Sequence, residues 1–127
     1  MGATVLVAED EPVVRRFVCK ILESDGHRVL VATDGQDALE KSRSFDGEID
    51  LLITDVVMPR MDGAALAEAI SRERPATRIL YMSGYSCDSL ASLLRGDKPY
   101  LRKPFPIAAL RAHIDALLNG SEQAVIY

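Results

Sequence analysis

The amino-acid sequence predicts an α/β domain in which a parallel sheet is covered by helices on both faces. Short apolar runs alternate with stretches of helical periodicity, and Gly, Pro or Asp separates most of them. This alternation is typical of βαβ units, which pair their strands in parallel. The chain has 127 residues, enough for one domain with its own core but not for two.

Five apolar and β-branched runs are expected to be strands, because each is short and ends at turn residues. In chain order they are Thr4–Ala8, Arg28–Ala32, Leu51–Asp55, Arg78–Met82 and the weaker Pro99–Arg102. The third run is the most apolar, and Pro59 followed by Asp62-Gly63 prevents it from continuing. Asp55 is therefore expected at the carboxyl end of a buried strand.

Five helices are expected to alternate with these strands. Pro12 suits a first helical turn, Gly26 can terminate a helix, and Asp62 can cap the third helix. In chain order the helices run from Pro12 to about Gly26, from Gln36 to Phe45, from Asp62 to before Pro75, from Asp88 to Leu94, and from Pro106 to Asn119. The domain is expected to occupy residues 1–120, followed by a loose tail at 121–127.

The order of the strands follows from the connections between them. Right-handed crossovers leave few topologies, and the length and count of the elements fit the flavodoxin-like order 2-1-3-4-5. We therefore expect a flavodoxin-like five-stranded parallel sheet with five helices on its two faces.

Composition disfavours several classes of function. The formal net charge of −4 argues against direct nucleic-acid binding. No apolar run approaches the ~20 residues of a membrane span, and the N-terminus does not resemble a signal peptide, so no membrane insertion is expected. Cys19 and Cys87 form no zinc-type cluster and suggest a reducing cytoplasm, and Cys19 is expected to be a small core or boundary residue.

Polar residues follow four of the five predicted strands. Glu9 and Asp10 follow the first strand, Asp55 ends the third, Ser83 follows the fourth and Lys103 follows the fifth. The carboxyl ends of parallel strands share one edge of a sheet, where ligands bind. A single Asp at such a place is often a turn residue, but four strands that deliver polar groups to one edge predict a binding site.

The residue types at this edge favour phosphoryl-transfer chemistry. Three carboxylates cannot stay ionised close together without a counterion, and oxygen ligands without His or Cys favour a hard cation, above all Mg²⁺. Lys103 can restrain Asp55 and hold a phosphoryl oxygen, and Ser83 offers a hydroxyl donor. Asp55 is the expected nucleophile, because carboxylates can form acyl phosphates.

As a set, these residues resemble the receiver domain of two-component response regulators, from about Val5 to Leu118. The motifs that carry the resemblance are Glu9-Asp10, Asp55 with Met58-Pro59 and Gly63, Ser83, and Lys103-Pro104-Phe105. Met82-Ser83-Gly84-Tyr85 is also similar to receivers attached to sensor kinases. The chain could therefore be a free-standing receiver or the receiver of a hybrid sensor kinase.

The resemblance implies a role for each matched residue. Asp55 would accept a phosphoryl group from the phosphohistidine of a sensor histidine kinase or a histidine phosphotransfer protein. Lys103 would contact that group, and Ser83 and Tyr100 would form the switch. The implied Mg²⁺ ligands are Glu9, Asp10, Asp55 and the backbone carbonyl of Val57. The family has Asp more often where Glu9 stands and Thr more often where Ser83 stands.

The resemblance also implies a signalling domain rather than an enzyme, apart from self-catalysed phosphoryl transfer and slow autodephosphorylation. A downstream effector would bind the face formed by the helix at 88–94, the strand at 99–102 and the last helix. Exposed candidates there are Arg95, Lys98, Tyr100 and Arg102. The first helix, around Arg15 and Arg16, would be a docking surface for the kinase. A monomer or weak dimer is expected.

Three other functions use some of the same ingredients. An Mg²⁺-dependent phosphohydrolase with an aspartyl nucleophile would need an acid/base carboxylate two residues after Asp55, where Val57 stands. Loss of the acidic residues or of the lysine would favour a phosphorylation-independent interaction module, but all of these residues are present here. A flavodoxin-like cofactor binder would need a Gly-rich loop where Glu9-Asp10-Glu11 stands.

His27, His113 and Arg72-Glu73-Arg74 are expected to be solvated.

Overall fold

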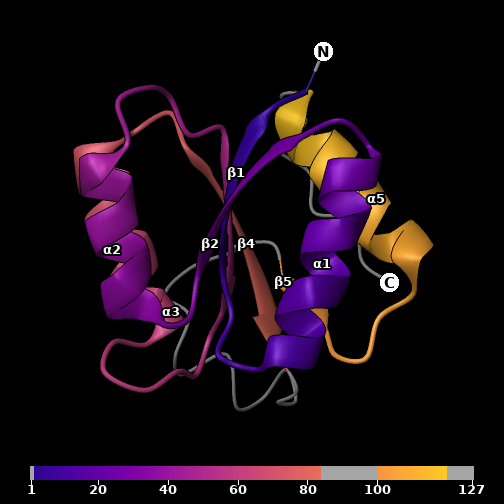
Figure 1. Ribbon diagram of the computed structural model, residues 1–127, viewed down its shortest axis with the longest axis horizontal. Coiled ribbons are helices and arrows are strands. Elements are labelled where there is room, and N and C mark those ends of the chain that lie inside the picture. The colour runs from indigo at the N-terminus through magenta and orange to yellow at the C-terminus, as the bar shows by residue number, and fades with distance from the viewer. Residues whose placement is uncertain (1, 84–99, 120–127) are drawn as a thin grey trace.

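The computed structural model describes residues 2–83 and 100–119 of an alternating α/β chain (Figure 1). The strands are β1 (Thr4–Ala8), β2 (Arg28–Ala32), β3 (Leu51–Asp55), β4 (Arg78–Ser83) and β5 (Tyr100–Arg102). The helices are α1 (Pro12–Ser24), α2 (Gly35–Ser44), α3 (Gly63–Glu73) and α5 (Ile107–Leu118). The predicted helix at 88–94, Cys87 and the predicted tail lie outside the described residues.

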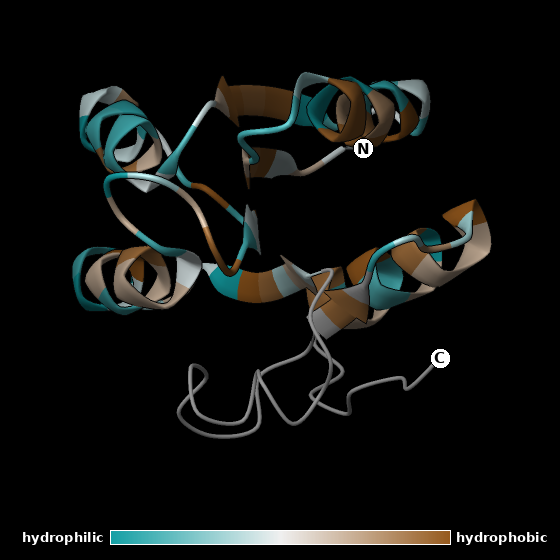
Figure 2. Ribbon diagram, turned by 90° about the horizontal axis from the view of Figure 1, so that it is seen from below, coloured by the Kyte–Doolittle hydropathy of each residue, from teal (hydrophilic) through white to brown (hydrophobic). Residues whose placement is uncertain are grey.

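The strands form one parallel sheet with the order β2-β1-β3-β4-β5. This is the predicted flavodoxin-like order, and the α/β architecture is confirmed. Figure 1 shows α2 and α3 on one side of the sheet and α1 and α5 on the other. Seen along the strands in Figure 2, two pairs of helices flank a largely apolar sheet. The marginal position of β2 also agrees with its lack of site residues.

Each face of the sheet has its own core, because successive residues of a strand point to opposite faces. In β1, Leu6 and Ala8 belong to the core that includes α2 and α3 residues, whereas Val5 and Val7 belong to the core that includes α1 and α5 residues. β3 lies at the centre of the sheet, and all its residues are buried. The central strand that ends in Asp55 is therefore fixed by packing on both faces.

Two aspartates set the starts of α2 and α3. Asp34 accepts a hydrogen bond from the backbone N–H of Asp37, and Asp62 accepts one from Ala65, both at 2.8 Å. Such N-caps satisfy amides that have no partner within the helix. The predicted cap at Asp62 is confirmed, and both helices begin at the end of the sheet where the strands finish.

The prediction that His113 is solvated was wrong. It is only 3% exposed and lies one helical turn from the buried Leu110, on the inner face of α5. Its burial lowers its pKa. His27 is half-buried, and its Nδ1 accepts a hydrogen bond from the backbone N–H of Ala3 at 3.0 Å. Cys19, in contrast, is a buried free thiol, which agrees with the first of the two predicted places, the core or its boundary.

Arg74 is also not the solvated residue that the sequence predicted. Its guanidinium donates hydrogen bonds to the carbonyls of Ser42, Phe45 and Gly47 and to the Ser42 hydroxyl. The side chain thereby ties the end of α3 to the end of α2. Phe17 of α1 is 41% exposed and lies against the ring of Phe105, with ring centroids 6.3 Å apart.

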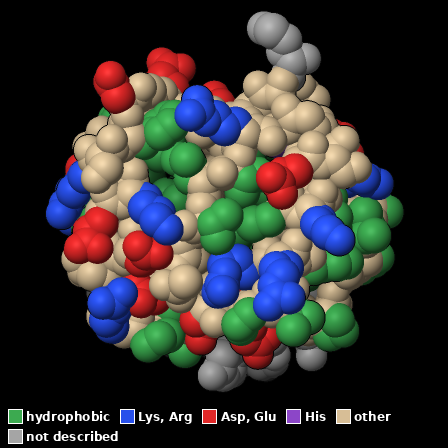
Figure 3. Space-filling view, viewed as in Figure 1, with side chains coloured by type: hydrophobic (Ala, Val, Ile, Leu, Met, Phe, Trp, Pro, Cys, Tyr) green, Lys and Arg blue, Asp and Glu red, His purple; other side chains and the backbone are tan. Residues whose placement is uncertain are grey.

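The surface carries charges of both signs. On the face shown in Figure 3, basic and acidic side chains are interspersed around a strip of apolar ones. Among the helices of the described part of the chain, none has both the length and the apolar character that crossing a membrane requires.

Gly63 joins the end of β3 to the start of α3. Its backbone N–H donates to the Val56 carbonyl at 2.7 Å. A Cβ at this position would lie 2.0 Å from the carbonyl oxygen of Asp55, and a backbone atom cannot move aside as a flexible side chain can. Glycine is therefore required here for the close approach of α3 to the strand that carries Asp55.

We expect Gly63→Ala to lower the free energy of unfolding by about 2–3 kcal/mol, because the added methyl group pushes the start of α3 away from β3. Urea unfolding followed by circular dichroism measures this change. The control is Ala65→Gly, in the same turn of α3, which should cost only about 1 kcal/mol through helix propensity. If Gly63→Ala stabilised the chain, as alanine does in an ordinary helix, the close approach would be wrong.

Candidate metal centre

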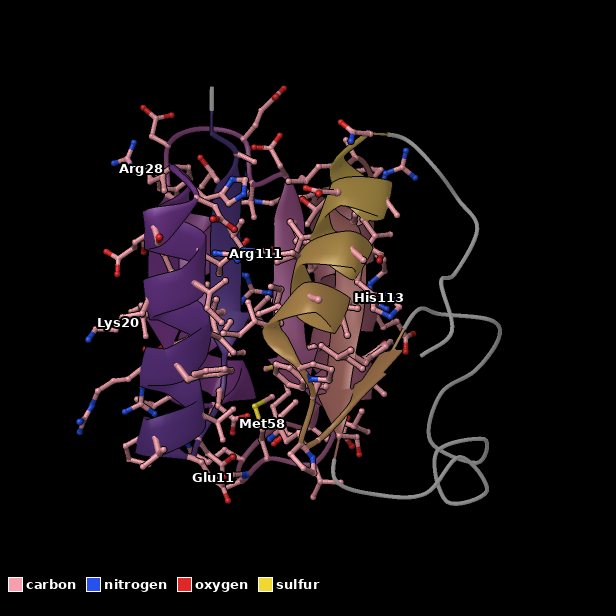
Figure 4. The ribbon with its side chains drawn as sticks, turned by 90° about the vertical axis from the view of Figure 1, so that its right-hand side faces the viewer. Glu11, Lys20, Arg28, Met58, Arg111 and His113 are labelled. Atoms are coloured by element: carbon pink, nitrogen blue, oxygen red, sulfur yellow. The ribbon has the colours of Figure 1, made fainter. Side chains whose placement is uncertain are left out.

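The candidate site lies at the carboxyl ends of the strands. In Figure 4 this is the lower end, where Glu11 and Met58 are labelled. Glu9 and Asp10 leave β1 there, and Asp55 ends the neighbouring β3. The acidic residues therefore come together because their strands are adjacent in the sheet.

The three carboxylates form one cluster. One oxygen from each of Glu9, Asp10 and Asp55 lies within 4.8 Å of the others. Glu9 is fully buried and Asp55 is 8% exposed, whereas Asp10 is exposed. A ligand could thus approach from the side of Asp10 and reach two carboxylates that are shielded from water.

Lys103 lies between two of these carboxylates. Its Nζ is 2.5 Å from Glu9 Oε1 and 2.9 Å from Asp55 Oδ2. Its backbone N–H donates to the carbonyl of Ser83 at 2.7 Å, which fixes the chain just after β5 against the end of β4. The lysine is therefore positioned by its backbone as well as by its charge.

Burial and pairing shift the pKa values in this cluster. Burial raises the pKa of Glu9 to about 7, although hydrogen bonds from Lys103 and from the Glu11 backbone act in the opposite direction. For Lys103, burial disfavours the charged form, but the bonds with Glu9 and Asp55 outweigh it and raise its pKa. Lys103 is thus a cation at neutral pH, while Glu9 titrates close to neutrality.

The donor set fits a hard divalent cation. Its protein atoms are carboxylate oxygens, which Mg²⁺ and Ca²⁺ prefer, with no nitrogen or sulfur ligand. One lysine cannot balance three carboxylates, so a cation would relieve their mutual repulsion. Within residues 2–83 and 100–119, no other group of three such side chains has this geometry.

The remaining predicted site residues are Ser83, Val57 and Tyr100, of which the Tyr100 side chain lies outside the described part of the chain. Ser83 is fully buried at the end of β4, one residue beyond Met82, which pairs with Asp55. Val57, two residues after Asp55, is 42% exposed. Tyr100 pairs with Tyr81 in the β4–β5 ladder. The sheet thus brings Glu9, Asp10, Asp55 and Lys103 together, and it places Ser83 on the strand between Asp55 and Lys103.

Two arginines make contacts beside the site that the sequence did not predict, although Arg15 was expected to belong to a docking surface on the first helix. Arg60, in the loop between β3 and α3, pairs with the nearly buried Asp34, with an Nε–Oδ2 distance of 2.8 Å. Arg15 donates from its Nη1 to the Glu9 carbonyl at 2.8 Å. No motif or periodicity marks either residue, and their closeness in sequence to Pro59 and Asp10 was the available signal.

We expect Glu9 to lower stability as pH rises between about 4.5 and about 7, because over this range the folded state retains a proton that the unfolded state has released. The stabilising contribution is fully present below the unfolded pKa and is lost through the folded pKa. The loss should reach about 3 kcal/mol. Urea unfolding in EDTA measures the free energy of unfolding of the wild type and of Glu9→Gln at several pH values. If the difference between the two did not change with pH, the expectation would be wrong.

Comparison with known proteins identifies the same family throughout. A model of the response regulator receiver domain matches residues 5–115. Sensor kinase CckA of Brucella abortus is 37% identical over 95% of this chain, which covers 13% of that protein. Response regulator receiver protein CpdR of the same species is 34% identical over 90% of this chain and 95% of its own length. The chain thus spans a small part of some relatives and nearly all of another.

Solved structures agree with these matches. A response regulator receiver protein from Sinorhizobium medicae has a TM-score of 0.85 and 30% identity, covering 95% of this chain and 98% of that chain. Response regulator TrrA from Thermotoga maritima, in complex with Mg²⁺-BeF, has a TM-score of 0.77 and 30% identity, covering 91% and 99%. Together with the carboxylate cluster, these findings show that the chain belongs to the receiver domain family of two-component response regulators.

Proposed function

We propose that this receiver domain accepts one phosphoryl group on Asp55, from a phosphohistidine and with Mg²⁺. The position of Asp55 carries the proposal. It ends the central strand, lies 2.9 Å from the Lys103 ammonium group and shares a cluster with two further carboxylates. A carboxylate in such surroundings has the charge partners that phosphoryl transfer requires.

In the proposed metal site, Glu9, Asp10 and Asp55 hold Mg²⁺, and the backbone carbonyl of Val57 completes the protein ligands. The chemistry that the ion supplies when bound is neutralisation of charge on the phosphoryl oxygens. TrrA, which resembles this chain, was solved in complex with Mg²⁺-BeF. That likeness and the oxygen-only donor set both support Mg²⁺ here.

During transfer, an Asp55 oxygen forms a bond to phosphorus while the bond from phosphorus to the donor imidazole nitrogen breaks. The product is an acyl phosphate, and the imidazole leaves with the electron pair of the broken bond. Lys103 balances charge on the phosphoryl oxygens, while Glu9 and the backbone contact with Ser83 hold the lysine in place. The acyl phosphate is then lost slowly by hydrolysis, so the domain signals rather than turns over substrate.

The proposed donor is a sensor histidine kinase or a histidine phosphotransfer protein. The proposed output is a downstream effector that binds the face of residues 88–94, β5 and α5. The names of the relatives, sensor kinase CckA and transcriptional activator PfeR of Pseudomonas aeruginosa, support partners of these two kinds. We take residues 1–120 as the receiver domain and residues 121–127 as its tail.

The wild-type chain is expected to gain one phosphate when it is incubated with acetyl phosphate and Mg²⁺, as measured by intact mass. EDTA and Asp55→Asn should each abolish the adduct, because one removes the cation and the other the acceptor oxygen. The matched control is Asp62→Asn, which changes a nearby exposed carboxylate but keeps a good N-cap. That variant should be phosphorylated like the wild type.

Each alternative function predicts a different result. Continuous turnover of p-nitrophenyl phosphate, without a stable adduct, would contradict the proposal and favour an aspartyl phosphohydrolase. If no adduct formed with acetyl phosphate or with a cognate kinase, the phosphorylation-independent module would be favoured. An adduct that persisted in Asp55→Asn would place the acceptor elsewhere.

We further propose that Ser83 and Tyr100 transmit the phosphorylated state. The Ser83 hydroxyl would bond a phosphoryl oxygen, and Tyr100, on the adjacent strand β5, would turn inward in response. The burial of Ser83 and the β4–β5 pairing support this route. The route places the change at the face where an effector would bind.

Ser83→Ala is expected to bind beryllium fluoride with Mg²⁺ but to lose most of the resulting NMR shifts at residues 100–102, because the hydroxyl link is missing. Amide spectra recorded with and without beryllium fluoride test this expectation. Tyr100→Ala should reduce the change in effector affinity that phosphorylation causes. The NMR shifts that beryllium fluoride causes in β4 should remain. Shifts in Ser83→Ala equal to those of the wild type would contradict the switch.

A further inference from the structure

We propose that Arg15 is a positioning residue of the metal centre, which holds the backbone of Glu9 and Asp10 so that their carboxylates meet Asp55. This inference rests on the proposed function in that Mg²⁺ is taken as the bound ion. It assigns Arg15 a role within the chain's own site, separate from any contact with a partner.

The Arg15 side chain turns back toward the connection between β1 and α1. Its Nη1 lies 2.8 Å from the Glu9 carbonyl oxygen and 3.5 Å from that of Asp10. Arg15 is half-buried, whereas the next residue, Arg16, is exposed, and its side chain makes no hydrogen bond or ion pair with a described residue. Lys20, one turn further along α1, projects away from the site in Figure 4.

The Glu9 carbonyl depends on this contact. β1 ends at Ala8, and the Glu9 N–H still bonds to the carbonyl of Ala32 at 3.1 Å. Among the described residues, Arg15 is the one that donates a hydrogen bond to the Glu9 carbonyl. Glu9 is fully buried, and leaving a buried carbonyl unpaired is costly. Arg15 thus fixes the orientation of the peptide that joins Glu9 to Asp10.

The position of the Asp10 carboxylate depends on this peptide more than the position of the Glu9 carboxylate does. The Glu9 carboxylate has partners of its own, Lys103 on Oε1 and the Glu11 backbone N–H on Oε2 at 3.0 Å. The Asp10 carboxylate is exposed and makes no hydrogen bond to a described residue. Its place in the cluster is therefore set by its backbone, which Arg15 holds.

Charge and positioning predict opposite effects of removing Arg15. A cation near the N-terminus of α1 is unfavourable with respect to the helix dipole, and it repels a bound metal ion. If charge alone mattered, Arg15→Ala would bind Mg²⁺ more tightly. If Arg15 positions the acidic residues, the same substitution weakens binding, as loss of groups that orient metal ligands generally does.

Calorimetric titration of the whole chain with Mg²⁺ distinguishes the two, and it suits a protein without tryptophan. We expect Arg15→Ala to raise the Kd about tenfold. The matched control, Arg16→Ala, removes the same charge one residue away and should change the Kd by less than about twofold. Arg15→Lys should bind more weakly than the wild type, because an ammonium on a flexible stem replaces a planar, fixed donor.

Equal or tighter binding by Arg15→Ala than by Arg16→Ala, with both variants folded by circular dichroism, would overturn the inference alone. Wild-type binding that Asp55→Asn left unchanged would overturn the proposed metal site as well, and so would a wild type that bound no Mg²⁺. Should Arg15→Ala fail to fold, Arg15→Lys decides the question, and a wild-type Kd in that variant would refute positioning by the guanidinium group.

Discussion

Three carboxylates at the end of a parallel sheet, faced by one lysine, are the constraint on which the rest of the structure depends. Lys103 pairs with Glu9 and Asp55, while Asp10 remains exposed to solvent. Burial raises the pKa of Glu9 to about 7, so the cluster can reduce its excess negative charge by keeping a proton or by binding a cation. In the proposed function, a divalent ion would offset this negative charge before an anionic phosphoryl group approached Asp55.

The fold holds this unfavourable cluster together from several sides. β1 and β3 are adjacent, interior strands, so the acidic residues leave the sheet from rigid positions. Gly63 lets α3 begin directly against the Asp55 carbonyl, and Arg60 ties the intervening loop to Asp34 at the start of α2. Packing of the two cores therefore compensates for charges that would otherwise repel each other.

Much of this site could be predicted from the sequence, because parallel strands finish at one edge. Asp55 ends a strand there, and Glu9, Asp10 and Lys103 each follow one. The side-chain contacts could not be predicted. Whether Arg15 turns toward the Glu9 carbonyl or into solvent depends on which groups tertiary packing leaves unpaired. For the same reason His113 was expected to be exposed and is buried. The roles of Ser83 and Tyr100 stay predictions, since they concern a change of state.

The most direct test of the account is to locate the phosphoryl group. Sodium borohydride reduces an acyl phosphate to an alcohol and so converts a phosphorylated aspartate into homoserine, which fragmentation of the peptide from Ser44 to Arg60 can place. This peptide also contains Asp46 and Asp50, which serve as internal controls. We expect homoserine at position 55 alone, formed with Mg²⁺ and absent in EDTA. Homoserine at position 46 or 50, or a reduced side chain at Glu9 or Asp10, would contradict phosphorylation of Asp55.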